Sequence, residues 1–173
     1  MHQENTDNLK PKMKSTYLAV VIGVIVIGLA VFFTYSSDQA KIRGFNFGNS
    51  LQAIQDELKQ IQTEFYSKKA MFDEGTIPRE EFLEFSELHL QRMRDILGRY
   101  DELTPPESFA NSVELFKIST KKQIESDRYL IEWIRTNDTS NKIRSDLLLQ
   151  ESFENEMAAL ASFTKAKNNA GQD

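Results

Sequence analysis

The sequence of 173 residues contains no cysteine and only two histidines, four prolines and seven glycines. The lack of cysteine excludes disulfides, thiolate nucleophiles, cysteine-ligated metal centres and a lipid attached through cysteine. The two histidines, His2 and His89, leave little capacity for acid–base or metal chemistry. A folded domain outside the cytoplasm must therefore depend on packing alone for its stability.

Basic charge is also scarce, because 21 lysines and arginines stand against 26 acidic residues and give a formal net charge of −5. No basic stripe is present that could displace counterions from phosphates, so a nucleic-acid partner is not expected. The acidic run formed by Glu80, Glu81, Glu84 and Glu87 is predicted to be a solvated helix face.

Sequence signatures of catalysis are missing as well. The chain has no GxSxG motif and no glycine-rich phosphate loop. A di-iron or di-manganese bundle needs two Glu-x-x-His pairs, and His89 is the single histidine outside the N-terminal tail. We therefore predict no catalytic, cofactor-binding or metal-binding residues and a protein that is not an enzyme.

One long apolar run stands out in a chain whose mean hydropathy is −0.47. The run has no polar side chain from Leu18 to Phe33, and the residues from Tyr17 to Tyr35 would form a helix of about 28 Å. This length matches the hydrocarbon core of a bilayer, and the two tyrosines lie where aromatic rings favour the interface. The sequence therefore predicts a transmembrane helix over residues 17–35.

Three lysines, Lys10, Lys12 and Lys14, precede this helix, so the positive-inside rule places a tail of residues 1–16 in the cytoplasm. The C-terminal domain is then extracytoplasmic and is attached to the cell membrane by a single span. A cleaved secretory signal is the alternative, but its apolar region is normally about 7–15 residues long and is followed by small residues. The longer run, which ends in VFFTYSSDQ, favours an uncleaved signal-anchor.

The region after the span, residues 36–173, carries a net charge of −6, because the first 16 residues hold three lysines and two acidic residues. Its length is sufficient for one hydrophobic core. Residues 36–48 are predicted to be a linker that contains Gly44 and Gly48. This linker forms either a hinge or a continuation of the membrane helix.

Four segments after residue 48 have apolar residues at helical spacing. They are separated by Gly75-Thr76 and Pro78, by Pro105-Pro106 and by residues 137–140, all of which are typical of helix ends and caps. The residues predicted to face the core are Leu51, Ile54, Leu58, Ile61, Phe65 and Phe72; Phe82, Phe85, His89, Met93, Ile96 and Tyr100; Phe109, Val113, Phe116, Ile124, Leu130, Ile131 and Ile134; and Ile143, Leu147, Phe153, Met157 and Leu160.

Four amphipathic helices with short connections are typical of an up-down-up-down bundle. The predicted fold class is all-α, with a transmembrane helix followed by an antiparallel four-helix bundle over residues 49–168 and a frayed tail over residues 169–173. This order of elements resembles that of the membrane-anchored helical-bundle sensor domains of bacterial receptors. The resemblance implies a sensor function.

Polar residues interrupt the predicted core at mid-height. Counting turns from the connections places His89 level with Thr120 and Gln150 level with Asp127, while Gln123 lies on the same inward stripe. This layer is either a set of hydrogen bonds that fixes the register of the helices or a site for a small molecule or a proton. The second interpretation follows because a buried imidazole near a carboxylate can titrate around neutrality.

The third helix carries a second apolar face, formed by Leu115, Ile118, Tyr129 and Trp133. Such a face indicates contact with something outside the bundle, such as a partner protein, a second copy or the lipid surface. The alternative is a central helix that packs on two neighbours. Asn137 begins an N-x-[ST] sequon in a predicted loop, which makes it a candidate glycosylation site.

These features predict a single-pass membrane protein whose extracytoplasmic helical bundle acts as an interaction or accessory module, for example in a membrane complex. Its expected partners are the lipid bilayer and either another protein or further copies of itself. The alternative function is a small-molecule or pH sensor that signals through a partner, and an enzyme is the least favoured.

Overall fold

The computed structural model describes the backbone of residues 38–170 and the side chains of residues 46–169. The long helices of this part are α2 (Asp38–Asp73), α3 (Arg79–Arg99), α4 (Ala110–Thr136) and α5 (Thr139–Ala170). Two short 3₁₀ turns, η2 (Tyr100–Glu102) and η3 (Glu107–Phe109), lie in the connection between α3 and α4. No strand occurs between residues 38 and 170, so the predicted all-α fold with four helices is confirmed.

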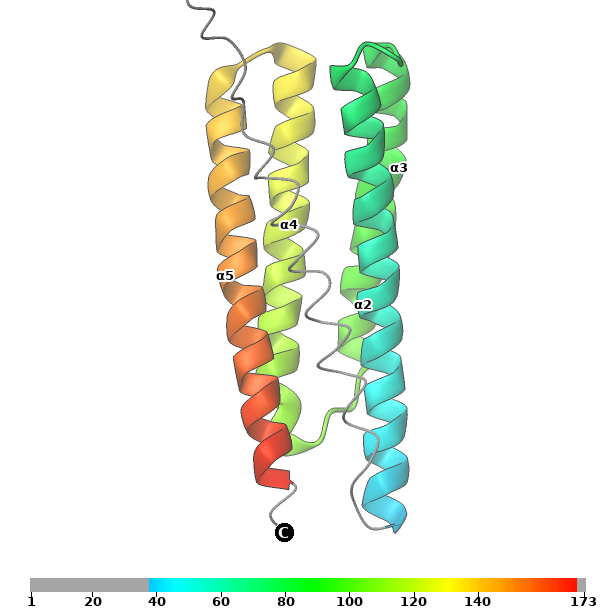
Figure 1. Cartoon of the computed structure of the whole chain (residues 1–173), viewed down its shortest axis with the longest axis vertical. Coiled ribbons are helices and arrows are strands. Elements are labelled where there is room, and N and C mark those ends of the chain that lie inside the picture. The colour runs from blue at the N-terminus through cyan, green and yellow to red at the C-terminus, as the bar shows by residue number, and fades with distance from the viewer. Residues whose placement is uncertain (1–37, 171–173) are drawn as a thin grey trace, which may run out of the picture.

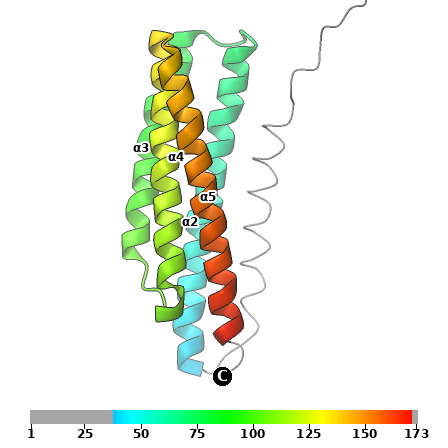
Figure 2. The ribbon, with the colours of Figure 1, turned by 90° about the vertical axis from the view of Figure 1, so that its left-hand side faces the viewer.

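Successive helices run in opposite directions, as an up-down-up-down bundle requires (Figure 1). The α2–α3 and α4–α5 connections lie at one end, which we call the upper end (Figures 1 and 2). The first turn of α2 and the last turn of α5 both lie at the opposite, lower end. The chain therefore enters and leaves the bundle at the same end.

Residues 38–48 of the predicted linker form the first three turns of α2. Of the two alternatives for the linker, these residues therefore adopt the helix and not the hinge. The predicted transmembrane helix over residues 17–35, with Tyr17 and Tyr35 at its ends, lies outside the described residues, as does the tail over residues 1–16. Of the helices between residues 38 and 170, none combines the length and the apolar character needed to cross a membrane.

The upper connections use two residues in the left-handed region of backbone conformation. Gly75 has a φ of +72° after α2, and Asn137 has a φ of +60° after α4. Glycine and asparagine adopt this conformation most readily, so both helices end where the sequence predicts. The N-cap residue of α3 is Pro78, and no side chain caps that helix.

The hydrophobic core lies where the predicted inward stripes of the first three helices meet. Phe65 and Phe82 have no exposed surface, and their ring centroids lie 5.7 Å apart. The other buried members of these stripes are Leu51, Ile54, Ile61, His89, Met93, Ile96, Tyr100, Phe109, Val113, Phe116, Ile124, Ile131 and Ile134. Half-buried side chains that pack against this core are Leu58, Phe72, Phe85 and Leu130. The predicted inward faces of these three helices are therefore confirmed.

The predicted inward face of the fourth helix is wrong. Ile143, Leu147, Phe153 and Met157 are exposed to 58%, 57%, 41% and 45%, and Leu160 is only half-buried. The buried residues of α5 are instead Ser145, Leu148, Ser152, Ala159, Phe163 and Ala166.

Small side chains explain this orientation of α5. The hydroxyl of Ser152 donates to the carbonyl oxygen of Ser119 at 2.9 Å, and the hydroxyl of Ser126 donates to that of Ser145 at 2.9 Å. Serine and alanine let two helix backbones approach closely, and the hydrogen bonds satisfy the buried hydroxyl groups. α5 therefore packs most closely on α4, whereas α2 and α5 are not among the closely packed helix pairs of the described residues.

Candidate functional site

A buried carboxylate connects three helices at the middle of the bundle. Asp127 of α4 has no exposed surface, and its Oδ2 lies 2.8 Å from Nε2 of His89 on α3. The same oxygen accepts a hydrogen bond of 3.1 Å from Nε2 of Gln62 on α2. Oδ1 of Asp127 accepts from Nε2 of Gln123 at 2.9 Å. An ionised carboxylate can only accept, so His89 donates through Nε2.

The imidazole of His89 is held between this carboxylate and an aromatic ring. Its ring stacks on Phe65 with centroids 4.0 Å apart and an interplanar angle of 13°. Within residues 46–169, Nδ1 of His89 and Oε1 of Gln62 are buried atoms without a hydrogen-bond partner. The contacts from Phe65 and Asp127 leave the ring a single orientation.

A half-buried tyrosine, Tyr66, extends the polar layer along the core. The hydroxyl of Tyr66 accepts a bond of 3.4 Å from Gln123, and burial and the charge of Asp127 raise the pKa of Tyr66 above its usual range. We use the name central polar layer for Gln62, Tyr66, His89, Gln123 and Asp127.

A second polar cluster lies nearer the lower end of the core. The hydroxyl of Tyr100 accepts a bond of 2.8 Å from Gln55 and lies 3.2 Å from Oγ1 of Thr120. Burial raises the pKa of Tyr100, so this phenol stays neutral and serves as a hydrogen-bonding group. Thr120 therefore belongs to this second cluster rather than to the central polar layer.

The structure places four of the five predicted polar residues in the core. The sequence did not predict several of the residues that form hydrogen bonds with them. His89, Thr120 and Asp127 are buried, and Gln123 is half-buried. Gln62 and Gln55 each follow a buried isoleucine of α2, which is the one signal that could have indicated them.

Gln150 does not belong to the buried layer. It is exposed on α5 and donates to Glu154 at 2.9 Å. The serine contacts between α4 and α5 turn this side of α5 outward, so the prediction that Gln150 lies opposite Asp127 is wrong.

The second apolar face of α4 lies beside α5. Leu115, Ile118, Tyr129 and Trp133 are all half-buried. α4 packs closely on both α3 and α5, which is the arrangement of the alternative interpretation. An interface with another molecule at this face stays a prediction.

Cationic side chains from α2, α4 and α5 lie over the two aromatic rings of this face. Lys69 of α2 and Lys142 of α5 lie 5.7 and 5.5 Å from the ring centroid of Trp133. Arg128 and Arg144 lie 4.9 and 5.4 Å from that of Tyr129. Asn137, the candidate glycosylation site, is exposed near the same end of the bundle, and its modification stays a prediction.

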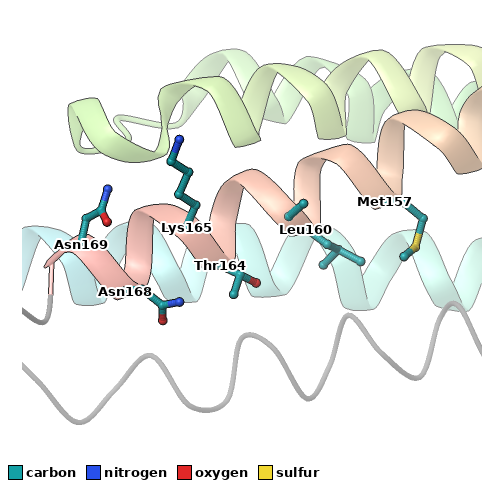
Figure 3. Close-up of a pocket in the computed structure, with 7 residues that line it drawn as sticks. Met157, Leu160, Thr164, Lys165, Asn168 and Asn169 are labelled. Atoms are coloured by element: carbon teal, nitrogen blue, oxygen red, sulfur yellow. The ribbon is translucent and has the colours of Figure 1, made fainter.

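The exposed face of α5 is the most unusual part of the surface. We call Ile143, Leu147, Phe153 and Met157 the α5 apolar surface. Its lower part borders an open depression of about 580 Å³ that is also lined by Leu160, Ala161, Thr164, Lys165, Asn168 and Asn169. Figure 3 shows these side chains projecting from one helix. Beside this surface, burial raises the pKa of the half-buried Glu156 carboxyl to about 7.

The chemistry available in this arrangement is hydrogen bonding and apolar contact. No group of three or more metal-ligating side chains occurs in the part of the chain that the structure describes. The central polar layer fixes the relative positions of α2, α3 and α4, because a shift of one helix would break the hydrogen bond that joins Asp127 to Gln62 or to His89. The exposed apolar side chains of α5 have no such role within the bundle.

Comparison of the chain with protein-family models, with curated proteins and with solved structures found no match. The function must therefore be argued from the geometry.

Proposed function

We propose that this chain is a single-pass membrane protein whose extracytoplasmic helical bundle binds other proteins as an interaction or accessory module. The observation that carries the proposal is the α5 apolar surface. Four large apolar side chains remain exposed on one helix, whereas the remaining exposed large hydrophobic residue of the described chain is Leu88. Clustered apolar exposure of this kind marks protein interaction sites, because it costs solvation free energy in an isolated molecule.

The membrane anchor is supported by the apolar run over residues 17–35 and by the geometry of the bundle. α2 starts at Asp38, three residues after Tyr35. The lower end of the bundle then faces the bilayer, and the upper connections point away from it. The α5 apolar surface would stand upright on the membrane, accessible from the side.

The sensor and enzyme alternatives have less support. A ligand or substrate would have to reach the central polar layer, where His89 is exposed to 2% and Asp127 to 0%. Phe65 covers one face of the imidazole. A role of this layer in helix register therefore fits the geometry better than a binding or catalytic role.

Membrane attachment is tested by placing charge in the apolar run. Ile25→Arg combined with Ile27→Arg is expected to release the chain from membranes, because each arginine at the centre of a spanning helix costs about 2.5–3.5 kcal/mol of insertion free energy. Flotation with lipid vesicles measures attachment, and protease protection of the bundle measures its side. Leu88→Arg, an exposed site on α3, is the matched control and should float like the wild type. A double variant that still floats would contradict the anchor.

The interaction role is tested at the lower part of the α5 apolar surface. Phe153→Ser combined with Met157→Ser should leave the melting temperature within a few degrees, because both side chains are exposed in the bundle. The proteins that copurify in mild detergent from the cells that make this chain should fall at least tenfold, as quantified by mass spectrometry. Lys59→Ser on exposed α2 surface is the control. An unchanged set of copurifying proteins would count against the interaction module.

A further inference from the structure

The outer side of α3 is an acidic face with an apolar centre. Glu80, Glu84 and Asp95 are exposed on this side, and none of them forms an ion pair within the described residues. Leu88, exposed to 54%, lies one turn after Glu84. We call Glu80, Glu84, Leu88 and Asp95 the α3 acidic face.

The edge between α4 and α5 has the complementary character. Arg128 and Arg144 converge on the ring of Tyr129, and neither guanidinium has a carboxylate within 4.0 Å in the described part of the chain. The exposed Ile143 and Leu147 lie beside Arg144 on the same helix. We call Arg128, Arg144, Ile143 and Leu147 the α5 basic edge.

Two acidic groups near this edge are paired with lysines, and Glu125, one turn before Arg128, is half-buried and forms no ion pair within the described residues. Asp146 lies 3.2 Å from Lys142, and Glu151 lies 2.7 Å from Lys122. The two arginines therefore leave a positive edge next to apolar surface, on a domain whose overall charge is negative. A partner with exposed carboxylates around an apolar side chain fits this chemistry.

The two faces cannot meet within one molecule. α3 and α5 lie diagonally across the bundle (Figures 1 and 2) and are not among the closely packed helix pairs of the described chain. They can meet between molecules, and their heights match. Glu84 and Arg144 each lie five residues from the first residue of their helix, about 8 Å below the upper end. Leu88 and Leu147 lie about 14 and 12 Å below it.

We propose that neighbouring copies of this chain bind side by side, with the α3 acidic face of one copy against the α5 basic edge of the next. Glu84 pairs with Arg144 at the same height, and Leu88 packs against Leu147. The matching heights require all copies to share one orientation, which membrane anchoring imposes. This contact therefore rests on the proposed function, and the partner of the interaction surface is a second copy of the chain.

The contact joins different faces of the same chain, so it is heterologous. Each added copy leaves one acidic and one basic face free, and the expected product is a row rather than a closed dimer. A symmetric pair would instead bring two arginine pairs or two acidic faces together, which like-charge repulsion disfavours. Confinement to the membrane plane raises the effective concentration, so a modest contact area is sufficient.

The absence of native cysteine makes crosslinking a direct test. Full-length chain carrying Leu88→Cys and Leu147→Cys, reconstituted in vesicles and mildly oxidised, should give a ladder of dimers, trimers and larger species on a non-reducing gel. Chains with either substitution alone should stay monomeric, and a mixture of the two single variants should give dimers and no larger species. Leu88→Cys combined with Ala53→Cys, an exposed position on α2, is the matched control without a ladder.

Charge exchange gives the second arm of the test. Arg144→Glu in the double-cysteine chain should reduce the ladder at least tenfold, and adding Glu84→Arg to that chain should restore it. Lys59→Glu should leave the ladder unchanged. Crosslinking of the Leu147→Cys single variant to itself would overturn the inference. The absence of a ladder from a double-cysteine chain that floats with vesicles would also overturn it, while the membrane anchor would stand. A chain that does not float would overturn the anchor and the shared orientation with it.

Discussion

Asp127→Ala is expected to lower the free energy of unfolding by about 3–5 kcal/mol, because leaving a buried hydrogen-bonding group without its partner costs about 1–3 kcal/mol and Asp127 serves several such groups. The carboxylate accepts hydrogen bonds from His89, Gln62 and Gln123. Without it, the buried donors His89 and Gln62 and the half-buried donor Gln123 lose their acceptor, and the buried ones must bear their desolvation cost. The loss of register between α2, α3 and α4 adds to this effect.

Denaturant unfolding of the full chain in detergent, followed by circular dichroism, measures this change. Asp56→Ala is the matched control, because Asp56 is exposed and its carboxylate accepts a hydrogen bond from Gln52 of the same helix. It should change the free energy of unfolding by less than about 0.5 kcal/mol. Asp127→Leu combined with His89→Leu should retain more stability than Asp127→Ala, because apolar side chains then replace both partners of the buried contact. An Asp127→Ala variant within about 1 kcal/mol of the wild type would contradict the role of the layer.

Phe65→Ala is expected to destabilise the bundle by about 3–5 kcal/mol, the usual cost of removing a fully buried phenylalanine. Phe65 has no exposed surface, packs on Phe82 and covers the imidazole of His89. Its removal leaves a cavity and exposes one face of the His89 ring to that cavity. The effect should therefore combine lost apolar burial with looser packing of the central polar layer.

Phe153 provides a control of the same residue type on the helix whose orientation differs from the prediction. Phe153→Ala should cost less than about 1 kcal/mol, because the side chain is already 41% exposed on α5. Thermal and denaturant unfolding of both variants measure the difference. Equal destabilisation by Phe65→Ala and Phe153→Ala would mean that α5 packs with its large apolar residues inward.

The stability effects of Asp127→Ala and Phe65→Ala are relevant to the proposed interactions, because a rigid core holds the outer surfaces of the helices in fixed positions. The central polar layer aligns α3 with α4, and the serine contacts align α4 with α5. The α3 acidic face and the α5 basic edge therefore keep the relative heights on which side-by-side contact depends. A variant that loosens the layer should also weaken the crosslinking ladder.

Sequence periodicity predicts α2, α3 and α4 well, because their large apolar residues recur at the helical period and face one core. Counting turns from the prolines sets His89 level with Thr120, which instead lies beside Tyr100, and so it misses the pairing of His89 with Asp127. Their contact at 2.8 Å depends on side-chain conformations that turn counting does not include. The Gln62 donor was missed because a glutamine beside an apolar stripe has the same pattern whether it is buried or exposed.

α5 shows where periodicity fails. Its large apolar residues indicate an inward face through Ile143, Leu147, Phe153 and Met157, yet the structure buries Ser145, Ser152 and Ala159 instead. Close helix packing favours small side chains, and the hydroxyl groups find acceptors on α4. A hydrophobicity pattern treats serine as polar and exposed, so it cannot detect such a contact.

The sequence by itself determined the four helices, their connections at Gly75, Pro105-Pro106 and Asn137, the apolar run over residues 17–35 and the absence of cysteine chemistry. These features depend on local conformational preference and on the spacing of apolar residues. The tertiary structure alone decided the orientation of α5, the donors to Asp127 and the surfaces left exposed. Those depend on which neighbour each helix approaches most closely, and that choice follows from side-chain size and hydrogen bonding between segments far apart in the chain.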